Sequence, residues 1–87
     1  MPPIDVTEDA FRDLERIADY LSDVSPRLAI QFVDAFEKVL ADLRLFPELG
    51  VRRGRRRVLI RAGFLYAYRA DGDLLVLLRI LDGRRQH

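Results

Sequence analysis

The stretch from Phe64 to Leu81 constrains the fold of this chain more than any other. Phe64, Tyr66 and Tyr68 alternate with other residues, an Asp-Gly pair follows, and an almost continuous apolar run returns from Leu74 to Leu81. This pattern is typical of a β-hairpin. The returning run is too apolar for a strand with one face in water, so we expect other elements or a partner to cover both of its faces.

The hairpin lies within a longer segment, Arg57 to Arg85, that ends in an arginine cluster. Just before the hairpin, Val58-Leu59-Ile60 is a short apolar run that we interpret as one further strand. The segment therefore predicts three strands joined by two tight turns, an antiparallel meander. Residues 48–57, ELGVRRGRRR, contain two glycines and five arginines, and we interpret them as a basic loop.

Two amphipathic helices are expected upstream. Thr7 is a suitable N-cap, and apolar residues then recur every three or four positions to about Leu21 or Ser22. Ser25-Pro26 predicts the start of a second helix, since proline is favoured in the first helical turn. Pro47 and the glycine that follows it at position 50 predict its end. The link between the helices is short, so they should form an antiparallel hairpin.

Together with a short first strand at residues 4–6, these elements predict one α+β domain over residues 1–87. The expected order is β-α-α-β-β-β, with the helical hairpin on one face of a largely antiparallel sheet. The opposite face of the sheet should remain open. We expect arginine side chains to line that open face and to offer a surface for a partner.

Composition excludes several kinds of site. The chain has no cysteine and a single histidine, His87, which rules out disulfides, thiolate metal sites and a zinc site built from several histidines. We therefore expect no metal and no cofactor. The first residues do not resemble a secretion signal, and no apolar run is long enough to cross a bilayer, so we expect a cytoplasmic protein.

The net charge is only +1, but acidic and basic residues are distributed unevenly along the chain. Residues 1–50 carry eleven acidic and five basic side chains, whereas residues 51–87 carry ten arginines and three aspartates. Arginine is suited to planar, bidentate contact with phosphate or carboxylate, but it is also a common solvent-exposed residue. Solvent exposure alone is a sufficient explanation for most single arginines, but less so for the dense group between Val51 and Val58, which comprises Arg52, Arg53, Arg55, Arg56 and Arg57.

Several of these segments, taken together, resemble the ParE/RelE superfamily of toxins from bacterial toxin–antitoxin systems. The resemblance covers essentially the whole chain. It rests on the first helix from Asp13 to Tyr20, the helix end 46–50 (FPELG), the aromatic strand 64–69, and the closing RIL and GRR of residues 79–81 and 83–85. The resemblance implies a toxin, neutralised by a separately encoded antitoxin that lays an extended segment and a helix across the sheet and the helical hairpin.

The superfamily has two well-known activities. RelE-like members cut messenger RNA on the ribosome and carry an arginine directly after the aromatic residue that follows the strand-opening glycine. In this sequence that position is Leu65. ParE-like members act on DNA gyrase without that nuclease set, so the resemblance favours a ParE-like inhibitor that binds gyrase and has no catalytic residues of its own.

Two alternatives remain open. In the first, the chain is a ribosome-dependent messenger RNA endonuclease, in which Arg61, Arg85 and His87 supply the chemistry. In the second, it is a non-toxic remnant that only binds antitoxin. Asp82 stands where many ParE-like relatives have histidine. For contact with the target or the antitoxin, the candidate residues are Arg57, Arg61, Arg79, Arg84 and Arg85.

Overall fold

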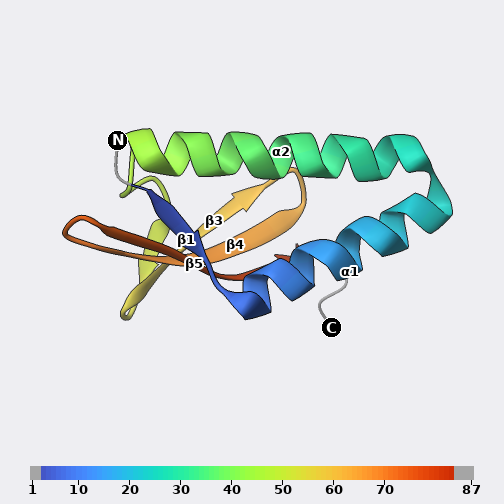
Figure 1. Ribbon diagram of the computed structural model, residues 1–87. Coiled ribbons are helices and arrows are strands. Elements are labelled where there is room, and N and C mark those ends of the chain that lie inside the picture. The colour runs from blue at the N-terminus through green and yellow to red at the C-terminus, as the bar shows by residue number, and fades with distance from the viewer. Residues whose placement is uncertain (1–2, 84–87) are drawn as a thin grey trace.

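A computed structural model describes residues 3–83 of the chain (Figure 1). Two long helices lie on one side of a five-stranded sheet, and one short strand precedes them. The predicted α+β class, the helical hairpin and its position on one sheet face are therefore confirmed. The elements are β1 (Ile4–Val6), α1 (Glu8–Val24), α2 (Pro26–Leu45), β2 (Val51–Arg53), β3 (Arg56–Arg61), β4 (Phe64–Asp71) and β5 (Leu74–Asp82).

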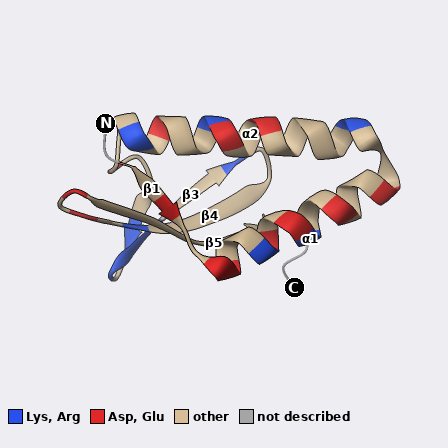
Figure 2. Cartoon of the chain, in the orientation of Figure 1, with Lys and Arg blue, Asp and Glu red and all other residues tan. Residues whose placement is uncertain are grey.

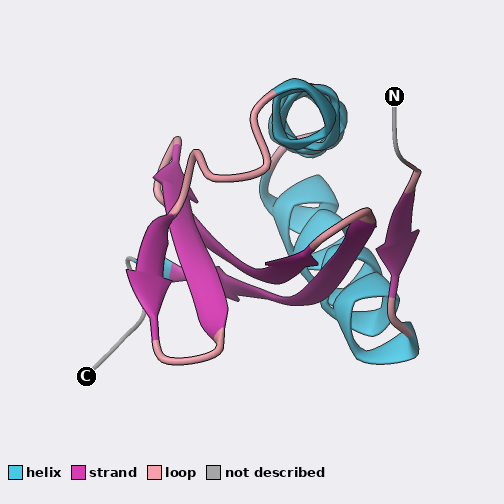
Figure 3. Ribbon diagram, turned by 90° about the vertical axis from the view of Figure 1, so that its left-hand side faces the viewer, coloured by secondary structure: helices cyan, strands magenta, loops and turns pink. Residues whose placement is uncertain are grey.

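The sheet has the strand order β1-β5-β4-β3-β2. Strands β2 to β5 form an antiparallel meander, but β1 pairs parallel to β5, with Ile4 opposite Leu75. The sheet is thus mixed. Figure 3, in which α2 is seen almost end-on, shows the strands curving around the helical side of the molecule.

The predicted basic loop at residues 48–57 is wrong in one respect, because it contains the whole of β2 and the start of β3. Arg52 pairs with Arg57 and Arg53 with Arg56, so consecutive arginines form two short strands. Gly54, with φ of 64°, supplies the left-handed conformation that this tight turn requires. The sequence pattern missed these strands because they contain almost no apolar residues whose alternation could reveal them.

Both helices begin where predicted, but only Thr7 caps its helix with a side-chain hydrogen bond; the side chain of Ser25 makes none. The hydroxyl of Thr7 accepts a hydrogen bond from the backbone N–H of Ala10 at 3.1 Å, and α1 runs to Val24, two to three residues beyond the predicted end. Ser25 alone separates the two helices, with Pro26 as the first residue of α2. Because the link is a single residue, the helices meet at Ser25 and diverge from there (Figure 1).

The core lies between the helices and the facing side of the sheet. Tyr66 and Tyr68 are fully buried in it, which confirms that the aromatic strand is part of the core. The ring of Phe32 from α2 packs 4.7 Å from the ring of Phe64, centroid to centroid. The other large buried apolar side chains are Ile4, Ile17, Leu21, Phe36, Val39, Leu43, Leu75, Leu77 and Ile80.

A β-bulge in β5 changes which of its apolar residues face the core. The register shifts between Ala67 and Tyr68, so that Leu77 and Ile80 both pair with core-facing residues although they are three positions apart. The helices cover this face only. On the opposite face the apolar side chains of β5 are half-buried or exposed. We expected both faces of this strand to be covered, and in the isolated chain only one is.

Candidate target- and partner-binding surfaces

Of the charged side chains in residues 3–83, only Asp13 on α1 is buried, with 5% of its surface exposed. Its carboxylate accepts hydrogen bonds from Arg79 Nε at 2.7 Å, from the backbone N–H of Ile80 at 2.9 Å and from Arg16 Nη2 at 2.9 Å. Burial by itself raises the pKa of Asp13, but the bonds from Arg79 and Ile80 outweigh it and hold the pKa below its ordinary 3.8. Asp13 is therefore a charged anchor between helix and sheet.

This anchor completes the outer edge of β5. Strand β1 covers β5 only from Leu75 to Leu77. Beyond it, Thr7 donates to the carbonyls of Leu77 and Leu78, both at 3.1 Å, and Asp13 then accepts the N–H of Ile80. A side chain of α1 thus replaces a neighbouring strand, and this edge is closed to further pairing.

The five arginines expected to contact a target or antitoxin have different surroundings. Arg79 donates two hydrogen bonds to Asp13, as described. Arg61 lies opposite core-facing Phe64, on the helix side of the sheet, and its Nη1 is 2.5 Å from Oδ2 of Asp42 on α2. Arg84 and Arg85 lie outside the described residues.

Arg57 also lies on the helix side, opposite Tyr68. Its Nη1 donates to the carbonyl of Gly50 at 2.9 Å and, more weakly, to that of Glu48 at 3.4 Å. Neither Arg57 nor Arg61 therefore lines the open face of the sheet. The expectation of an arginine-lined open face is wrong for these two side chains, because the strand alternation turns them toward the helices.

Tyr68 fixes the segment that follows α2. Its hydroxyl accepts from the N–H of Gly50 and donates to the carbonyl of Pro47, both at 2.8 Å. A Cβ atom on Gly50 would lie 2.8 Å from the Tyr68 ring, so no other residue fits there without a shift. By contrast, the buried hydroxyl of Tyr66 has no hydrogen-bond partner among the described residues, and burial raises the pKa of Tyr66 to about 12.

The open face of the sheet carries an apolar strip at its centre. Its residues pair across four strands: Val51 of β2 with Val58 of β3, Ile60 of β3 with Leu65 of β4, and Leu65 with Leu81 of β5. Ile60 is 70% exposed and Val51 59%. The outer strip, as we name it, consists of Val51, Val58, Ile60, Leu65 and Leu81.

Beside the outer strip, the edge of β3 is only partly covered. The β2–β3 ladder ends at the pair Val51 and Val58, so residues 59–61 have no strand neighbour on that side. Unpaired backbone groups next to exposed apolar side chains offer a place where an extended peptide can add to a sheet. No sequence pattern predicts this edge, because its position depends on where β2 ends.

Four arginines surround the turn between β2 and β3, and all four are exposed. Figure 2 shows the blue of arginine on both strands of this hairpin, which extends away from the helices. Across residues 3–83, none of these four side chains has an ion pair or a side-chain hydrogen bond. The basic hairpin, as we name it, comprises Arg52, Arg53, Arg55 and Arg56.

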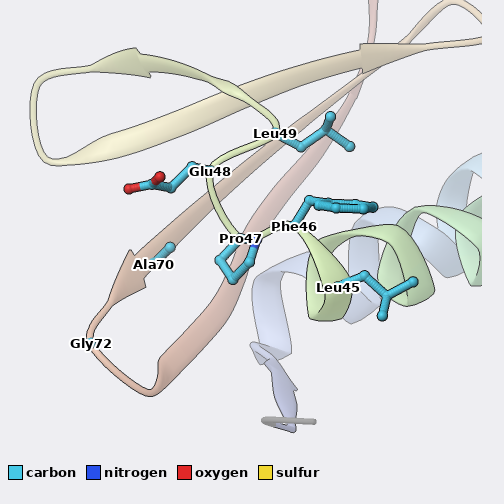
Figure 4. A pocket seen from close by; sticks show the side chains of 7 residues that line it. All are labelled: Leu45, Phe46, Pro47, Glu48, Leu49, Ala70 and Gly72. Atoms are coloured by element: carbon cyan, nitrogen blue, oxygen red, sulfur yellow. The ribbon is translucent and has the colours of Figure 1, made fainter.

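An open cleft of about 660 Å³ lies between the end of α2 and the β4–β5 hairpin (Figure 4). Phe46 is 62% exposed there and Leu45 58%. The cleft has one charged residue in its lining, Glu48. It is a second exposed apolar surface, which sequence reasoning did not identify because Pro47 and its neighbours were interpreted only as a helix end.

The residues of the catalytic alternative are not assembled in the described part of the chain. Arg85 and His87 lie outside it, and Arg61 is paired with Asp42. Leu65, at the position of the nuclease arginine, belongs to the apolar outer strip. Residues 3–83 contain no group of three or more His, Cys, Asp or Glu side chains that could hold a metal ion. No helix within the same range is long and apolar enough to cross a membrane.

Comparison with known proteins identifies the family. The model of the ParE toxin of type II toxin–antitoxin systems, parDE, matches residues 4–87. Among solved structures, the chromosomal ParDE toxin–antitoxin system from P. aeruginosa is similar, with 25% identity, a TM-score of 0.75, and 94% and 96% of the two chains covered.

The toxin–antitoxin complex RelBE2 from Mycobacterium tuberculosis shares the fold, with 24% identity, a TM-score of 0.65, and 94% and 99% of the two chains covered. Curated protein sequences include none that matches significantly. The family match spans nearly the entire chain, including the helical hairpin, the meander and the basic hairpin. The chain therefore belongs to the ParE toxin family of type II toxin–antitoxin systems.

Proposed function

We propose that this toxin arrests growth by binding DNA gyrase, and that a cognate antitoxin neutralises it. The observation that carries the first part is the environment of Leu65. An arginine at this position would place a cation on the open sheet face, where a phosphate could be held as charge develops. Instead, Leu65 lies between Ile60 and Leu81 in an apolar strip, which supports inhibition by binding over RNA cleavage.

The surroundings of Arg61 support the same proposal. Its guanidinium is paired with the carboxylate of Asp42. This negative charge offsets the positive charge with which Arg61 would otherwise bind a phosphate. Arg61 and Arg79 remain proposed contacts with the target, because their side chains are 35% and 45% exposed and each guanidinium has more donors than its aspartate uses. Gyrase as target would place the toxin in the cytoplasm.

The outer strip and the open edge of β3 support the proposed antitoxin contact. Ile60 and Val51 belong to one contiguous apolar strip on an exposed sheet face, and such a patch is typical of a protein–protein interaction site. A partner strand added along residues 59–61 would pair the free backbone groups and cover Ile60 at the same time. This arrangement fits an antitoxin with an extended segment flanked by a helix.

Purified chain should inhibit supercoiling by gyrase and leave messenger RNA on ribosomes intact. His87→Ala should arrest growth as well as the unchanged sequence, whereas it should lose activity if the chain is an endonuclease. Cleavage of ribosome-bound messenger RNA would overturn the gyrase proposal. Absence of growth arrest on induction without antitoxin would instead favour the non-toxic remnant.

The antitoxin contact has its own test. Ile60→Asp places a charge at the centre of the outer strip, so the variant should still arrest growth but should no longer be rescued by the co-expressed antitoxin. Asp73→Asn, an exposed change in the turn between β4 and β5, is the control and should be rescued normally. Normal rescue of Ile60→Asp would place the antitoxin elsewhere.

A further inference from the structure

The basic hairpin concentrates positive charge without any internal compensation. Arg53 lies directly opposite Arg56, and Arg52 opposite Arg57. Like charges in directly opposed positions of an antiparallel pair destabilise it. Within the described chain, no carboxylate forms an ion pair with any of the four arginines of the basic hairpin; Glu48 lies 3.9 Å from Arg57, outside the group. An arrangement that costs stability in the free chain indicates a polyanionic ligand that removes the repulsion when it binds.

The shape of the hairpin limits which kind of polyanion can bind to it. Successive residues of a strand point to opposite faces, so Arg53 and Arg56 project from one face of the two-stranded ribbon and Arg52 from the other, with Arg55 at the turn. Cations on both faces and at the tip suit a groove that has anionic walls on two sides. A flat acidic protein surface would contact one face only.

The major groove of B-DNA is wide enough for a two-stranded β-ribbon, and phosphates line both of its edges. The major groove of A-form RNA is too narrow and deep for side chains to enter. Single-stranded nucleic acid is usually held by aromatic side chains that stack on bases, and residues 51–57 contain none. Duplex DNA therefore fits the hairpin better than RNA or a single strand.

We propose that the basic hairpin enters the major groove of duplex DNA and binds its phosphates without sequence preference. This function does not require gyrase, and it would hold the toxin on the DNA that a topoisomerase also occupies. Contacts of this kind fix position but do not read bases. The outer strip and the open edge of β3 take no part in it.

Fluorescence anisotropy of the full chain with a labelled duplex of about 20 base pairs tests the proposal. Non-specific binding of this kind has a Kd of about 10⁻⁴ to 10⁻⁶ M at physiological salt. Four phosphate contacts predict that affinity falls about 100-fold when salt rises from about 50 to about 200 mM. No binding at the lower salt concentration would overturn the proposal.

A double variant and a matched control separate the hairpin from the overall charge. Arg53→Gln/Arg56→Gln should lose at least about tenfold in affinity and flatten the logarithmic salt dependence by about two units. Arg27→Gln/Lys38→Gln removes the same charge from exposed positions of α2 and should bind like the unchanged chain. Equal losses in both variants would show a general charge effect and refute a hairpin site.

Competitors distinguish the other polyanions. Unlabelled duplex DNA should displace the probe at lower concentration than duplex RNA, single-stranded DNA or polyglutamate at equal charge. Stronger competition by polyglutamate would assign the hairpin to an acidic protein partner. Stronger competition by either RNA or single-stranded DNA would likewise contradict insertion into a B-form groove.

Discussion

The two edges of the sheet use arginine in opposite ways. At the β5 edge, Arg79 binds the buried carboxylate of Asp13, and that carboxylate also accepts the N–H of Ile80. At the β2 edge, Arg53 and Arg56 face each other, and neither forms an ion pair with a carboxylate of residues 3–83. The first edge is closed to strand addition and the second is not. In this chain, an arginine of the sheet is structural or available for a partner according to the acids that lie beside it.

The largest effect on stability should follow from removing the charge of Asp13, which closes the β5 edge. Asp13→Asn removes the charge that compensates Arg79 and weakens the acceptor for Ile80, so the free energy of unfolding should fall by about 2–4 kcal/mol. Urea unfolding of the variant and the unchanged chain measures this difference in free energy. Asp19→Asn, an exposed change on the same helix, is the control and should shift stability by less than about 0.5 kcal/mol. Equal stability of the two variants would mean that Asp13 does not anchor α1.

Acid should break the same anchor reversibly. Because the pKa of Asp13 is lower in the folded chain than its ordinary 3.8, the folded state binds fewer protons in this range. The stability that Asp13 contributes is therefore complete above about pH 5 and disappears as pH falls through the folded-state pKa. The difference in unfolding free energy between the unchanged chain and Asp13→Asn should shrink over that range. A difference that does not vary between neutral pH and acid would contradict the assignment.

The open edge depends on Tyr68, which holds the segment leading into β2. Tyr68→Phe leaves the N–H of Gly50 and the carbonyl of Pro47 without their partner, so stability should fall by about 1–2 kcal/mol. Tyr66→Phe removes a buried hydroxyl that has no partner in the described chain and should be neutral or stabilising. Thermal unfolding of the two variants gives the comparison. A larger loss from Tyr66→Phe would reverse the roles assigned here.

The smallest effect should come from the basic hairpin itself. Arg53→Gln/Arg56→Gln relieves one cross-strand repulsion, so stability should rise by about 0.2–1 kcal/mol at low salt, with a smaller gain at high salt. Denaturant unfolding at two ionic strengths measures the change. A loss of stability would indicate that these arginines support the fold of the free chain, in contrast to the unpaired state described above.

Much of the fold could be predicted because its signals are local. The Thr7 cap, the Ser25-Pro26 helix start and the Asp71-Gly72 turn each depend on the conformational preference of one or two residues, and each lies where it was expected. The strand β2 could not be predicted in this way. Its arginines have no apolar alternation, and they pair with β3 only because Gly54 reverses the chain.

The candidate surfaces were less predictable for a related reason. The sequence identified Arg52, Arg53, Arg55 and Arg56 as a dense basic group, and the structure keeps them exposed and together. It did not separate them from Arg57, whose guanidinium donates to the carbonyls of Gly50 and Glu48. The outer strip was also missed, since its residues come from four strands.

By itself, the sequence determined the helices, the meander, the buried aromatic strand and the family, because each depends on local periodicity or on a pattern read along the chain. Only the tertiary structure decided which arginines are occupied. Asp13 and Arg79 are 66 positions apart, and Asp42 and Arg61 are 19 apart. Coulomb attraction and hydrogen bonding depend on distance in space, which no local pattern records, so the ion pairs that leave the basic hairpin free appear only once the helices pack on the sheet.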